Sequence, residues 1–409
     1  MKYAIVIPDG ASDEPQESLG GRSPLQAART PNMDAIAREG VLGISRNVPD
    51  RFVPASDVAT LSLLGYDPVV YYTGRAPLEA AAMGIPLGPD DWAIRCNLMT
   101  IDDGLMTDFT AGHITSEEGR ALIEVLQIGL APPNPGVEFH PGVSYRNLMV
   151  YRARPDETPF AEDTFTTPPH DVADQPAESY LPDGTGSNLL NELMEVGSIL
   201  IRSHPVNRAR MEAGKRPANA IWLWGWQAPS MPPFSALHGV KGAIVSAVDL
   251  VRGVALLAGW DRVDAPGATG YLDTDYASKA RTAIATLKTH DLVCVHVEAP
   301  DEASHEGRAE AKVEALERID ADIVGPLREA LKSYGDHRIL ISPDHSTLIR
   351  TRAHDRAPVP WAIAGSGIGD AKDPSIGYDE MSARNAGGPF LDEGWRLMDF
   401  FLKGKSIAR

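Results

Sequence analysis

Aspartate and histidine residues recur in this sequence directly after short apolar runs. Carboxylate oxygen and imidazole nitrogen together suit divalent ions such as Zn²⁺ and Mn²⁺. Asp301 and His305 are four residues apart, so they can meet on one helical turn. Singly, each such residue has an ordinary alternative, because Asp-Gly after a strand is usually a turn and an Asp-His pair is usually exposed. Their repetition across the chain predicts a metal site, whose candidate ligands are Asp9, Asp301, His305, Asp344, His345 and His354.

A serine lies between these motifs, at the predicted start of an amphipathic helix. Ser56 follows Val53-Pro54-Ala55 and precedes an apolar pattern that continues to Leu64. Free backbone N–H groups and the helix dipole at such a start favour a phosphate or an alkoxide. A plain N-cap is the alternative, since serine is a common capping residue. The two interpretations are compatible, because a metal ion beside the hydroxyl would lower its pKa and make it a nucleophile.

Positioning these residues requires several strands that end at the same edge of a sheet. Short β-branched runs alternate with helical patterns over much of the chain, which predicts an α/β fold with a mostly parallel sheet flanked by helices. Loops that carry ligands would then meet at the carboxyl edge of that sheet. Thr30, Pro31 and Gly40 predict the start and end of one helix. The predicted strands cover residues 3–7, 243–247, 291–297 and 338–342, and helical periodicity returns over 309–332.

The middle of the chain has a different texture. Residues 88–217 are rich in Pro, Gly and short alternating segments, for example 93–100. Alternation followed by tight turns is typical of antiparallel strands. We therefore predict a smaller, substrate-facing α+β domain at 88–217, inserted into a metal-binding α/β core formed by 1–87 and 218–409. Within the insertion, 155–183 is predicted to be a long loop.

Composition excludes several classes of function. The 409 residues include 56 Asp and Glu against 38 Lys and Arg, giving a formal net charge of -18, so no nucleic-acid partner is expected. The apolar run that follows Met1 is too short for a signal peptide or a membrane span, and no membrane partner is expected. Cys96 and Cys294 lack the spacing of a disulfide framework, which predicts a reducing cytoplasm.

A set of motifs that spans nearly the whole chain carries a family resemblance. These motifs are Ile7-Pro8-Asp9-Gly10, Thr30 to Asp34, Ser56-Asp57-Val58-Ala59, Tyr72 to Ala80, Asp301 with His305, Pro343-Asp344-His345, and His354 with Pro358-Val359-Pro360. Together they resemble the archaeal-type 2,3-bisphosphoglycerate-independent phosphoglycerate mutases of the alkaline phosphatase superfamily. The resemblance implies an alkaline-phosphatase-like fold and the interconversion of 3-phosphoglycerate and 2-phosphoglycerate through a phosphoserine intermediate.

The resemblance also implies two bound divalent ions, either manganese or zinc, or magnesium. One ion would be held by Asp301, His305 and His354. The other would be held by Asp9, Ser56, Asp344 and His345. Ser56 would take the phosphoryl group from 3-phosphoglycerate, hold it while the glycerate reorients, and return it to the other hydroxyl. Paired metals fit this chemistry, because they can stabilise both the attacking and the leaving oxygen of an in-line displacement.

Arginines would clamp the anionic groups of such a substrate, since the planar guanidinium matches phosphate and carboxylate. Arg75 is the first candidate, because core packing does not explain its Gly-Arg segment. Arg210 and Arg252 are second candidates, and a solvated helix face or an exposed ion pair explains them equally well. His113 stands where the family pattern has an arginine, and a histidine is a weaker fixed clamp.

The segment around His113 also suggests another acceptor. Ala111-Gly112-His113-Ile114 is closer to a bacterial subgroup of the same family that is proposed to act as homoserine kinases. A phosphotransferase that acts on homoserine or another small molecule at the same two-metal site is therefore the alternative to the mutase. A protein that binds metal or phosphate without turnover is a third hypothesis, and retention of the whole ligand set with Ser56 argues against it.

Overall fold

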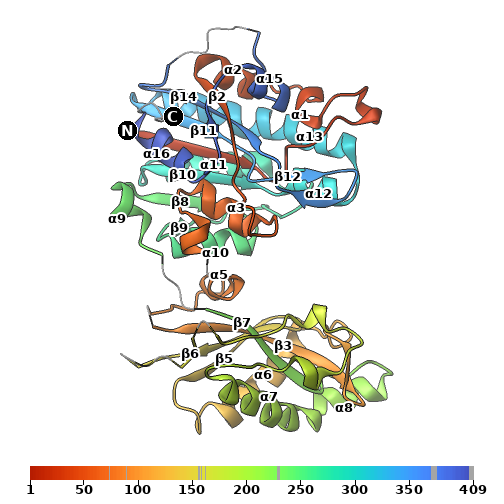
Figure 1. Ribbon diagram of the computed structural model, residues 1–409. Coiled ribbons are helices and arrows are strands. Elements are labelled where there is room, and N and C mark those ends of the chain that lie inside the picture. Colours follow the sequence, from red (N-terminus) through yellow and green to blue (C-terminus); the bar gives the residue numbers. More distant parts are fainter. Residues whose placement is uncertain are drawn as a thin grey trace. The chain divides into compact units, whose positions relative to one another are not determined.

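The apolar runs that the sequence analysis predicts as strands are neighbours in one eight-stranded sheet of the computed structural model (Figure 1). The sheet has the order β15-β2-β14-β11-β1-β10-β8-β9. Its strands are β1 (Lys2–Pro8), β2 (Val41–Ser45), β8 (Gly242–Val245), β9 (Asp261–Arg262), β10 (Leu292–Val297), β11 (His337–Ile341), β14 (Val359–Gly365) and β15 (Phe390–Leu391). Strand β1 pairs in parallel with β10 and β11, and β10 pairs in parallel with β8. Only β14 runs antiparallel to its neighbours, so the sheet is mostly parallel, as predicted.

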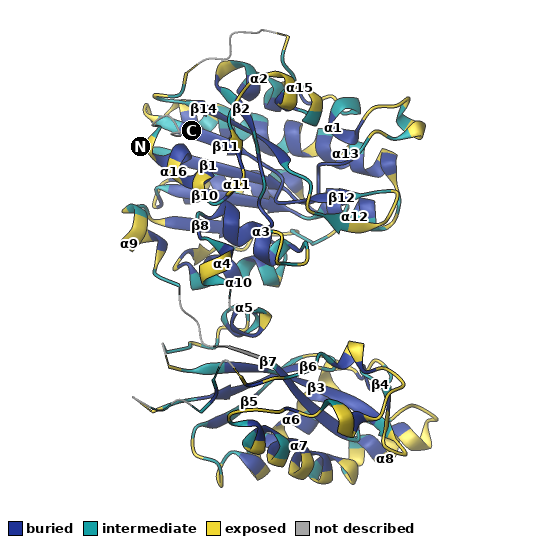
Figure 2. Cartoon of the chain, viewed as in Figure 1, coloured by how far each residue is buried: buried dark blue, intermediate teal, exposed yellow. Residues whose placement is uncertain are grey.

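Both faces of this sheet are covered, which explains the continuous apolar runs of its central strands. In β1, Ala4 and Val6 pack with the helices of one face, whereas Tyr3 points to the other face and contacts Phe401. Figure 2 shows these strands as buried. The helices and turns around the sheet are η1 (Glu17–Leu19), α1 (Pro24–Ala27), α2 (Pro31–Glu39), α3 (Ser56–Leu63), α4 (Pro68–Tyr71), α9 (Phe234–His238), α10 (Asp249–Leu257), α11 (Tyr276–Thr286), α12 (Ala299–His305), α13 (Ala309–Ile319), η4 (Asp320–Val324), α14 (Gly325–Lys332), α15 (Glu380–Asn385) and α16 (Arg396–Lys403).

A second sheet is antiparallel throughout and has its own core. Its strands are β3 (Trp92–Asp102), β4 (Leu105–Asp108), β5 (Val137–Val143), β6 (Arg146–Tyr151) and β7 (Ala220–Gln227), with β3 paired to β4, β6 and β7. The helices that accompany it are α5 (Arg75–Ala82), α6 (Ser116–Leu130), α7 (Ser187–Arg202) and α8 (Pro205–Glu212). Asp103 and Gly104 form the β3–β4 turn with φ of 49° and 80°. The predicted loop 155–183 contains the short turns η2 (Pro169–Asp171) and η3 (Ala177–Tyr180) among its described residues.

Contacts divide the chain into unit 1, Met1–Tyr72 with Met231–Arg409, and unit 2, Thr73–Ser230. The structure describes all residues except 73, 89, 155–156, 158, 162, 228–230, 370–374 and 405–409. The boundaries lie outside the predicted limits of 88 and 217, because α5 packs on β3 and β7 pairs with β3. Composition alone assigned both elements to the core.

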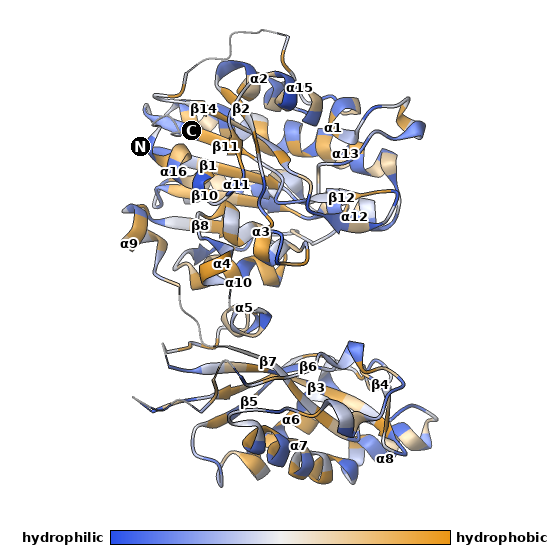
Figure 3. Cartoon of the chain, viewed as in Figure 1, coloured by the Kyte–Doolittle hydropathy of each residue, from blue (hydrophilic) through white to orange (hydrophobic). Residues whose placement is uncertain are grey.

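Hydropathy follows this division into two cores. The central strands of the large sheet carry orange segments in Figure 3, whereas helices such as α7 show both orange and blue. The amphipathic pattern of α7 buries Leu190, Leu193 and Ile201 against the second sheet. No helix within the described ranges is long and apolar enough to cross a membrane.

Candidate metal centre

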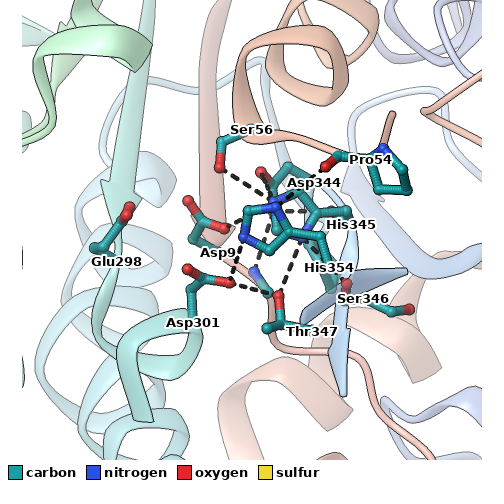
Figure 4. Close-up of polar contacts among 12 residues, drawn as sticks. Asp9, Pro54, Ser56, Glu298, Asp301, Asp344, His345, Ser346, Thr347 and His354 are labelled. Atoms are coloured by element: carbon teal, nitrogen blue, oxygen red, sulfur yellow. Dashed lines mark hydrogen bonds and ion pairs between the residues drawn. The ribbon is translucent and has the colours of Figure 1, made fainter. Parts of the chain in front are cut away.

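Three neighbouring parallel strands deliver the predicted ligands to one edge of the large sheet. Asp9 follows β1, Asp301 lies two residues into the helix that follows β10, and Asp344 comes three residues after β11. Since β11, β1 and β10 are adjacent and parallel, their carboxyl ends coincide. Figure 4 shows the three carboxylates gathered around His345 and His354. The sequence prediction that these motifs converge is therefore met by the topology of unit 1.

The predicted ligands form two candidate groups, called the first and the second ligand group, and the first consists of Asp301, His305 and His354. His305 Nε2 lies 3.0 Å from Asp301 Oδ2, and His354 Nε2 lies 3.4 Å from Asp301 Oδ1. The two Nε2 atoms are 3.0 Å apart. His305 comes from the end of α12, one turn after Asp301, whereas His354 comes from β13 (Ala353–Asp355), which forms a hairpin with β12 (Ser346–Leu348). The α12 turn is the i, i+4 arrangement that the spacing predicted.

The orientation of both imidazoles suits a cation. His305 Nδ1 lies 2.9 Å from the Arg352 carbonyl oxygen, and His354 Nδ1 lies 3.3 Å from that of Pro54. A carbonyl oxygen only accepts, so each Nδ1 carries a proton and the two Nε2 atoms are left facing each other. Two facing lone pairs beside a carboxylate form a stable arrangement only with a proton or a metal ion between them. The geometry of this group therefore fits a divalent ion.

The second ligand group consists of Asp9, Asp344, His345 and Ser56. His345 Nε2 lies 3.5 Å from Asp9 Oδ1, 3.3 Å from Asp344 Oδ2 and 3.1 Å from Ser56 Oγ. Both aspartates and His345 are at most 1% exposed. Thr347 gives its hydroxyl proton to Asp301, so its oxygen accepts from His345 Nδ1 at 3.2 Å. The His345 Nε2 lone pair consequently faces two carboxylates and the serine.

Each aspartate of this second group has one oxygen held by the protein and one left over. Asp344 Oδ1 accepts hydrogen bonds from the Gly10 and His345 backbone N–H groups. Asp344 Oδ2 and Asp9 Oδ1 are buried and have no hydrogen-bond partner among the described residues. Burial, followed by the charges of Asp344 and Glu298, raises the pKa of Asp9 well above its ordinary value. Unpaired buried oxygens of this kind are costly without a cation, so the residues present fit a metal ion here.

Ser56 is the first residue of α3 but does not cap the helix. The N-cap position is Ala55, which has no capping side chain, and Ser56 Oγ turns toward His345 instead. The capping interpretation of Ser56 is therefore wrong. Its hydroxyl lies at the positive end of the helix dipole and against the second ligand group, and such surroundings favour the deprotonated form of a hydroxyl.

The two ligand groups are adjacent. Ligand atoms of Asp9, Asp301 and His345 lie within 4.8 Å of one another, which links the groups across the edge of the sheet. In the metal-free chain, burial opposes ionisation of Asp301, but its hydrogen bonds with His305 and His354 outweigh burial and lower its pKa. Asp301 in turn raises the pKa of His305 to about 9. Protons thus occupy positions that cations would take.

Comparison with known proteins shows which family the chain is similar to. A family model described as 2,3-bisphosphoglycerate-independent phosphoglycerate mutase matches residues 37–207. A protein of that name from Methanothrix thermoacetophila is 49% identical over 406 residues, which cover 99% of this chain and 100% of the relative. The chain belongs to this mutase family. A relative from Geobacter sulfurreducens, named as a probable enzyme of the same kind, is 47% identical over 98% of this chain and 100% of its own length.

Two solved structures are similar to this mutase family member over both units. A protein from Pyrococcus horikoshii has a TM-score of 0.80 at 29% identity, covering 100% of this chain and 98% of that one. A cofactor-independent phosphoglycerate mutase from Thermoplasma acidophilum has a TM-score of 0.74 at 25% identity, covering 99% and 100%. The predicted family resemblance and the α/β fold class are confirmed.

Three further residues of this mutase family member lie beside the ligands and were not predicted. Glu298 follows β10, and burial raises its pKa to about 7. Lys279 of α11 is fully buried and donates to the His296 carbonyl at 3.0 Å. His296 is a polar residue inside an otherwise apolar strand, and that interruption next to a ligand motif was the one signal in the sequence.

Arg252, predicted to bind substrate, lies in unit 1 on α10 and already has protein partners. Its Nε donates to the Ser246 carbonyl at 2.6 Å, and its terminal nitrogens pair with Asp249 and Asp264 at 3.0 Å each. Because Ser246 directly follows β8, Arg252 fixes the carboxyl end of that strand. A contact of Arg252 with substrate stays a prediction.

The other predicted substrate residues, Arg75, His113 and Arg210, belong to unit 2. Arg75 begins α5 and is exposed, and His113 is exposed on the loop before α6. Arg210 is 2% exposed, and its guanidinium donates to the carbonyl oxygens of Ala111, Gly112 and Arg216 and pairs with Glu118 at 2.6 Å. Arg210 is thus an anchor of the loop that carries His113, and the substrate contacts of Arg75 and His113 stay predictions.

Proposed function

We propose that this chain interconverts 3-phosphoglycerate and 2-phosphoglycerate without 2,3-bisphosphoglycerate, through phosphorylation of Ser56 at a site for two divalent ions. The observation that carries this proposal is the position of Ser56. Ser56 is the first residue of α3, and its hydroxyl lies 3.1 Å from His345 Nε2. The two aspartates beside that histidine, Asp9 and Asp344, each have one unpartnered oxygen within the described part of the chain. Full-length relatives named as this mutase support the substrate.

The reaction would consist of two successive displacements at phosphorus. In the first, a bond forms between Ser56 Oγ and phosphorus as the bond from phosphorus to the 3-oxygen of glycerate breaks, and the proton lost by Ser56 ends on that oxygen. In the second, the 2-hydroxyl oxygen attacks the same phosphorus, and Ser56 Oγ leaves and regains a proton. When bound, the divalent ions lower the pKa of the Ser56 hydroxyl and offset charge on the phosphoryl oxygens.

The donor set indicates which residues would hold the ions. Asp301, His305 and His354 would hold one, and Asp9, Ser56, Asp344 and His345 the other. Three imidazoles among these ligands favour Mn²⁺ or Zn²⁺ over Mg²⁺, because magnesium prefers oxygen ligands and retains water. Metal analysis of the purified chain after loading with each ion tests this assignment.

A coupled assay tests the activity. The manganese-loaded protein is mixed with 3-phosphoglycerate and enolase in the absence of 2,3-bisphosphoglycerate, and formation of the enolase product is followed. We expect turnover by the natural chain and a loss on the order of 10⁴-fold or more in Ser56→Ala, since removal of a nucleophile costs about this much. Ser62→Ala, a buried serine of the same helix, is the matched control and should remain active.

The same preparations distinguish the alternative acceptor. ATP-dependent phosphorylation of homoserine with no turnover of 3-phosphoglycerate would replace the mutase by the homoserine kinase hypothesis. Binding of metal and of 3-phosphoglycerate with turnover of neither substrate would indicate a protein that only binds. Mass spectrometry of a rapidly quenched reaction should find a phosphoryl group on Ser56, and its absence during turnover would exclude the phosphoserine route.

A further inference from the structure

His296 is buried beside Asp9 but belongs to neither predicted ligand group. It lies on β10, and its side chain is completely enclosed. Its Nε2 lies 2.8 Å from Asp9 Oδ2, and its Nδ1 lies 3.2 Å from Ser246 Oγ. Because β8 and β1 flank β10 in the sheet, the residue after β8 and the residue after β1 both reach this histidine.

The hydrogen bonds of Ser246 and the carboxylate of Asp9 together favour one tautomer of His296. The Val248 backbone N–H donates to Ser246 Oγ at 3.1 Å. That bond uses one acceptor site of Ser246 Oγ and leaves its hydroxyl proton for the other neighbour, so Ser246 can donate to His296 Nδ1. His296 Nε2 therefore carries the ring proton and donates it to Asp9 Oδ2. The opposite tautomer would set an Nε2 lone pair against Asp9 Oδ2 at 2.8 Å, which is unfavourable when Asp9 is ionised, the form in which it binds a cation.

This donation fixes the direction of the second Asp9 oxygen. A carboxylate is planar, so holding Oδ2 sets the rotation of the group and points Oδ1 at its neighbours. Asp9 Oδ1 lies 3.5 Å from His345 Nε2 and is without a hydrogen-bond partner among the residues that the structure describes. Lys279 also holds the backbone of His296 in place, because its buried ammonium donates to the His296 carbonyl at 3.0 Å.

We propose that His296 is a positioning residue that, through its Nε2–H and with Ser246 setting its tautomer, holds Asp9 in the orientation required to bind the ion of the Ser56 group. The inference rests on the proposed function only in taking Asp9 as a metal ligand. His296 does not touch the substrate or the reacting atoms. It acts on one of the two ions, because the Asp301, His305 and His354 group shares no hydrogen bond with it among the described residues.

Manganese titration separates this role from a purely structural one. Free Mn²⁺ is measured by electron paramagnetic resonance while it is added to the metal-free protein, which yields the number of ions and the affinity of each. In His296→Leu, one ion should bind about 10- to 100-fold more weakly, the usual cost of losing such a hydrogen bond behind a ligand, while the other ion binds as before. His296→Asn keeps an N–H donor and should recover most of the affinity.

A matched control exists at the other end of the same strand. His290 precedes β10, is also buried, and places its Nε2 2.8 Å from Asp261 Oδ2, but Asp261 is not a predicted ligand. His290→Leu should bind both ions with natural affinity. Ser246→Ala removes only the group that sets the tautomer and should weaken the same ion by a few-fold, which keeps the proposal testable if His296→Leu does not fold.

The outcomes separate this inference from the proposed function. Natural affinity for both ions in folded His296→Leu, or equal weakening of both ions, would overturn the inference and leave the mutase assay untouched. Three ions bound to the natural chain, with one missing from His296→Leu and from His296→Asn, would make His296 a ligand and also overturn it. A natural chain that binds manganese as expected but does not turn over 3-phosphoglycerate would instead count against the proposed function.

Discussion

The candidate metal centre of unit 1 and the His113 turn of unit 2 fix their side chains by opposite means. At the metal centre, ordinary strand ends bring buried side chains together, and those side chains hold one another. In the turn, the backbone is unusual, since Ala111, Gly112 and His113 have φ of 49°, 63° and 49°. The His113 side chain itself is exposed. Position is thus set by sheet topology in one region and by local backbone conformation in the other.

Consecutive left-handed residues need strong partners, because each L-residue there costs about 1–2 kcal/mol. Asp108 provides them on one side of the turn, accepting from the Thr110 hydroxyl and from the backbone N–H groups of Thr110 and Gly112. Arg210 provides them on the other side by donating to two carbonyl oxygens of the turn. Substitutions at the candidate metal centre should therefore change metal binding, whereas those around the turn should change stability.

The largest effect should follow from Asp344→Asn. The Asp344 Oδ2 atom loses its charge where no described residue offers it a hydrogen bond, so the ion of the Ser56 group should be lost and the mutase rate should fall on the order of 10³-fold. Metal content and the enolase-coupled rate are measured together. Asp291→Asn, at the amino end of β10, is the control and should keep both. Full activity of Asp344→Asn with two bound ions would refute the ligand assignment.

Arg210→Met should lower the stability of the chain and leave manganese binding unchanged. The substitution removes the buried guanidinium that pairs with the partly exposed Glu118 and donates to three carbonyl oxygens. Each carbonyl that stays buried without a donor costs about 1–3 kcal/mol. Urea unfolding should show this loss while unit 1 still binds manganese with natural affinity. Arg208→Met, exposed on the same helix, should unfold like the natural chain. Weakened manganese binding in folded Arg210→Met would erase the contrast between the two regions.

Acidity should also affect the two regions differently. In the metal-free chain the hydrogen bond with Asp301 raises the pKa of His305 to about 9, so a binding ion must displace a proton. Manganese affinity should therefore increase between about pH 6 and 8, by up to roughly tenfold per unit for one proton. The stability that this contact gives the metal-free fold has the opposite sign, being complete below about pH 6.5 and lost as pH rises toward 9.

Calorimetric titration of manganese at several pH values measures this dependence. His113→Asn is the control from the other region, and its affinity curve should overlay that of the natural chain. An affinity that does not change between about pH 6 and 8 would show that no proton leaves His305 when the ion binds.

Ligands at strand ends were predictable because motif type and position relative to an apolar run are both local features of the sequence. Asp9, Asp301 and Asp344 could be assigned to one edge as soon as their strands were taken as parallel neighbours. The role of His296 depends on β8 lying beside β10 and on the partners of Ser246, and neither is local. The helix start at Ser56 was visible, whereas the direction of its hydroxyl was not.

The position of the Arg210 side chain also depends on non-local contacts that the sequence does not show. The local sequence around an arginine near the end of a short amphipathic helix does not reveal whether the side chain faces solvent, substrate or a buried turn. Only the return of α8 to the turn before α6 buries its guanidinium. The left-handed backbone there was equally hard to predict, because Ala111 is not a residue that a sequence marks for positive φ.

The smallest predicted effect isolates the backbone of the turn. In Gly112→Ala, a Cβ at φ 63° would lie 3.2 Å from both Arg210 Nη2 and Arg216 Cβ, so conformational strain and crowding add. Gly104→Ala has φ 80° with nothing within 4 Å, so it carries only the strain of about 1 kcal/mol. Gly112→Ala should therefore lower the melting temperature more than Gly104→Ala, each kcal/mol corresponding to about 2–4 °C, with manganese affinity unchanged in both. If the two variants melted together, the arginines would be yielding to the methyl group, and the turn would be held by Asp108 rather than clamped from both sides.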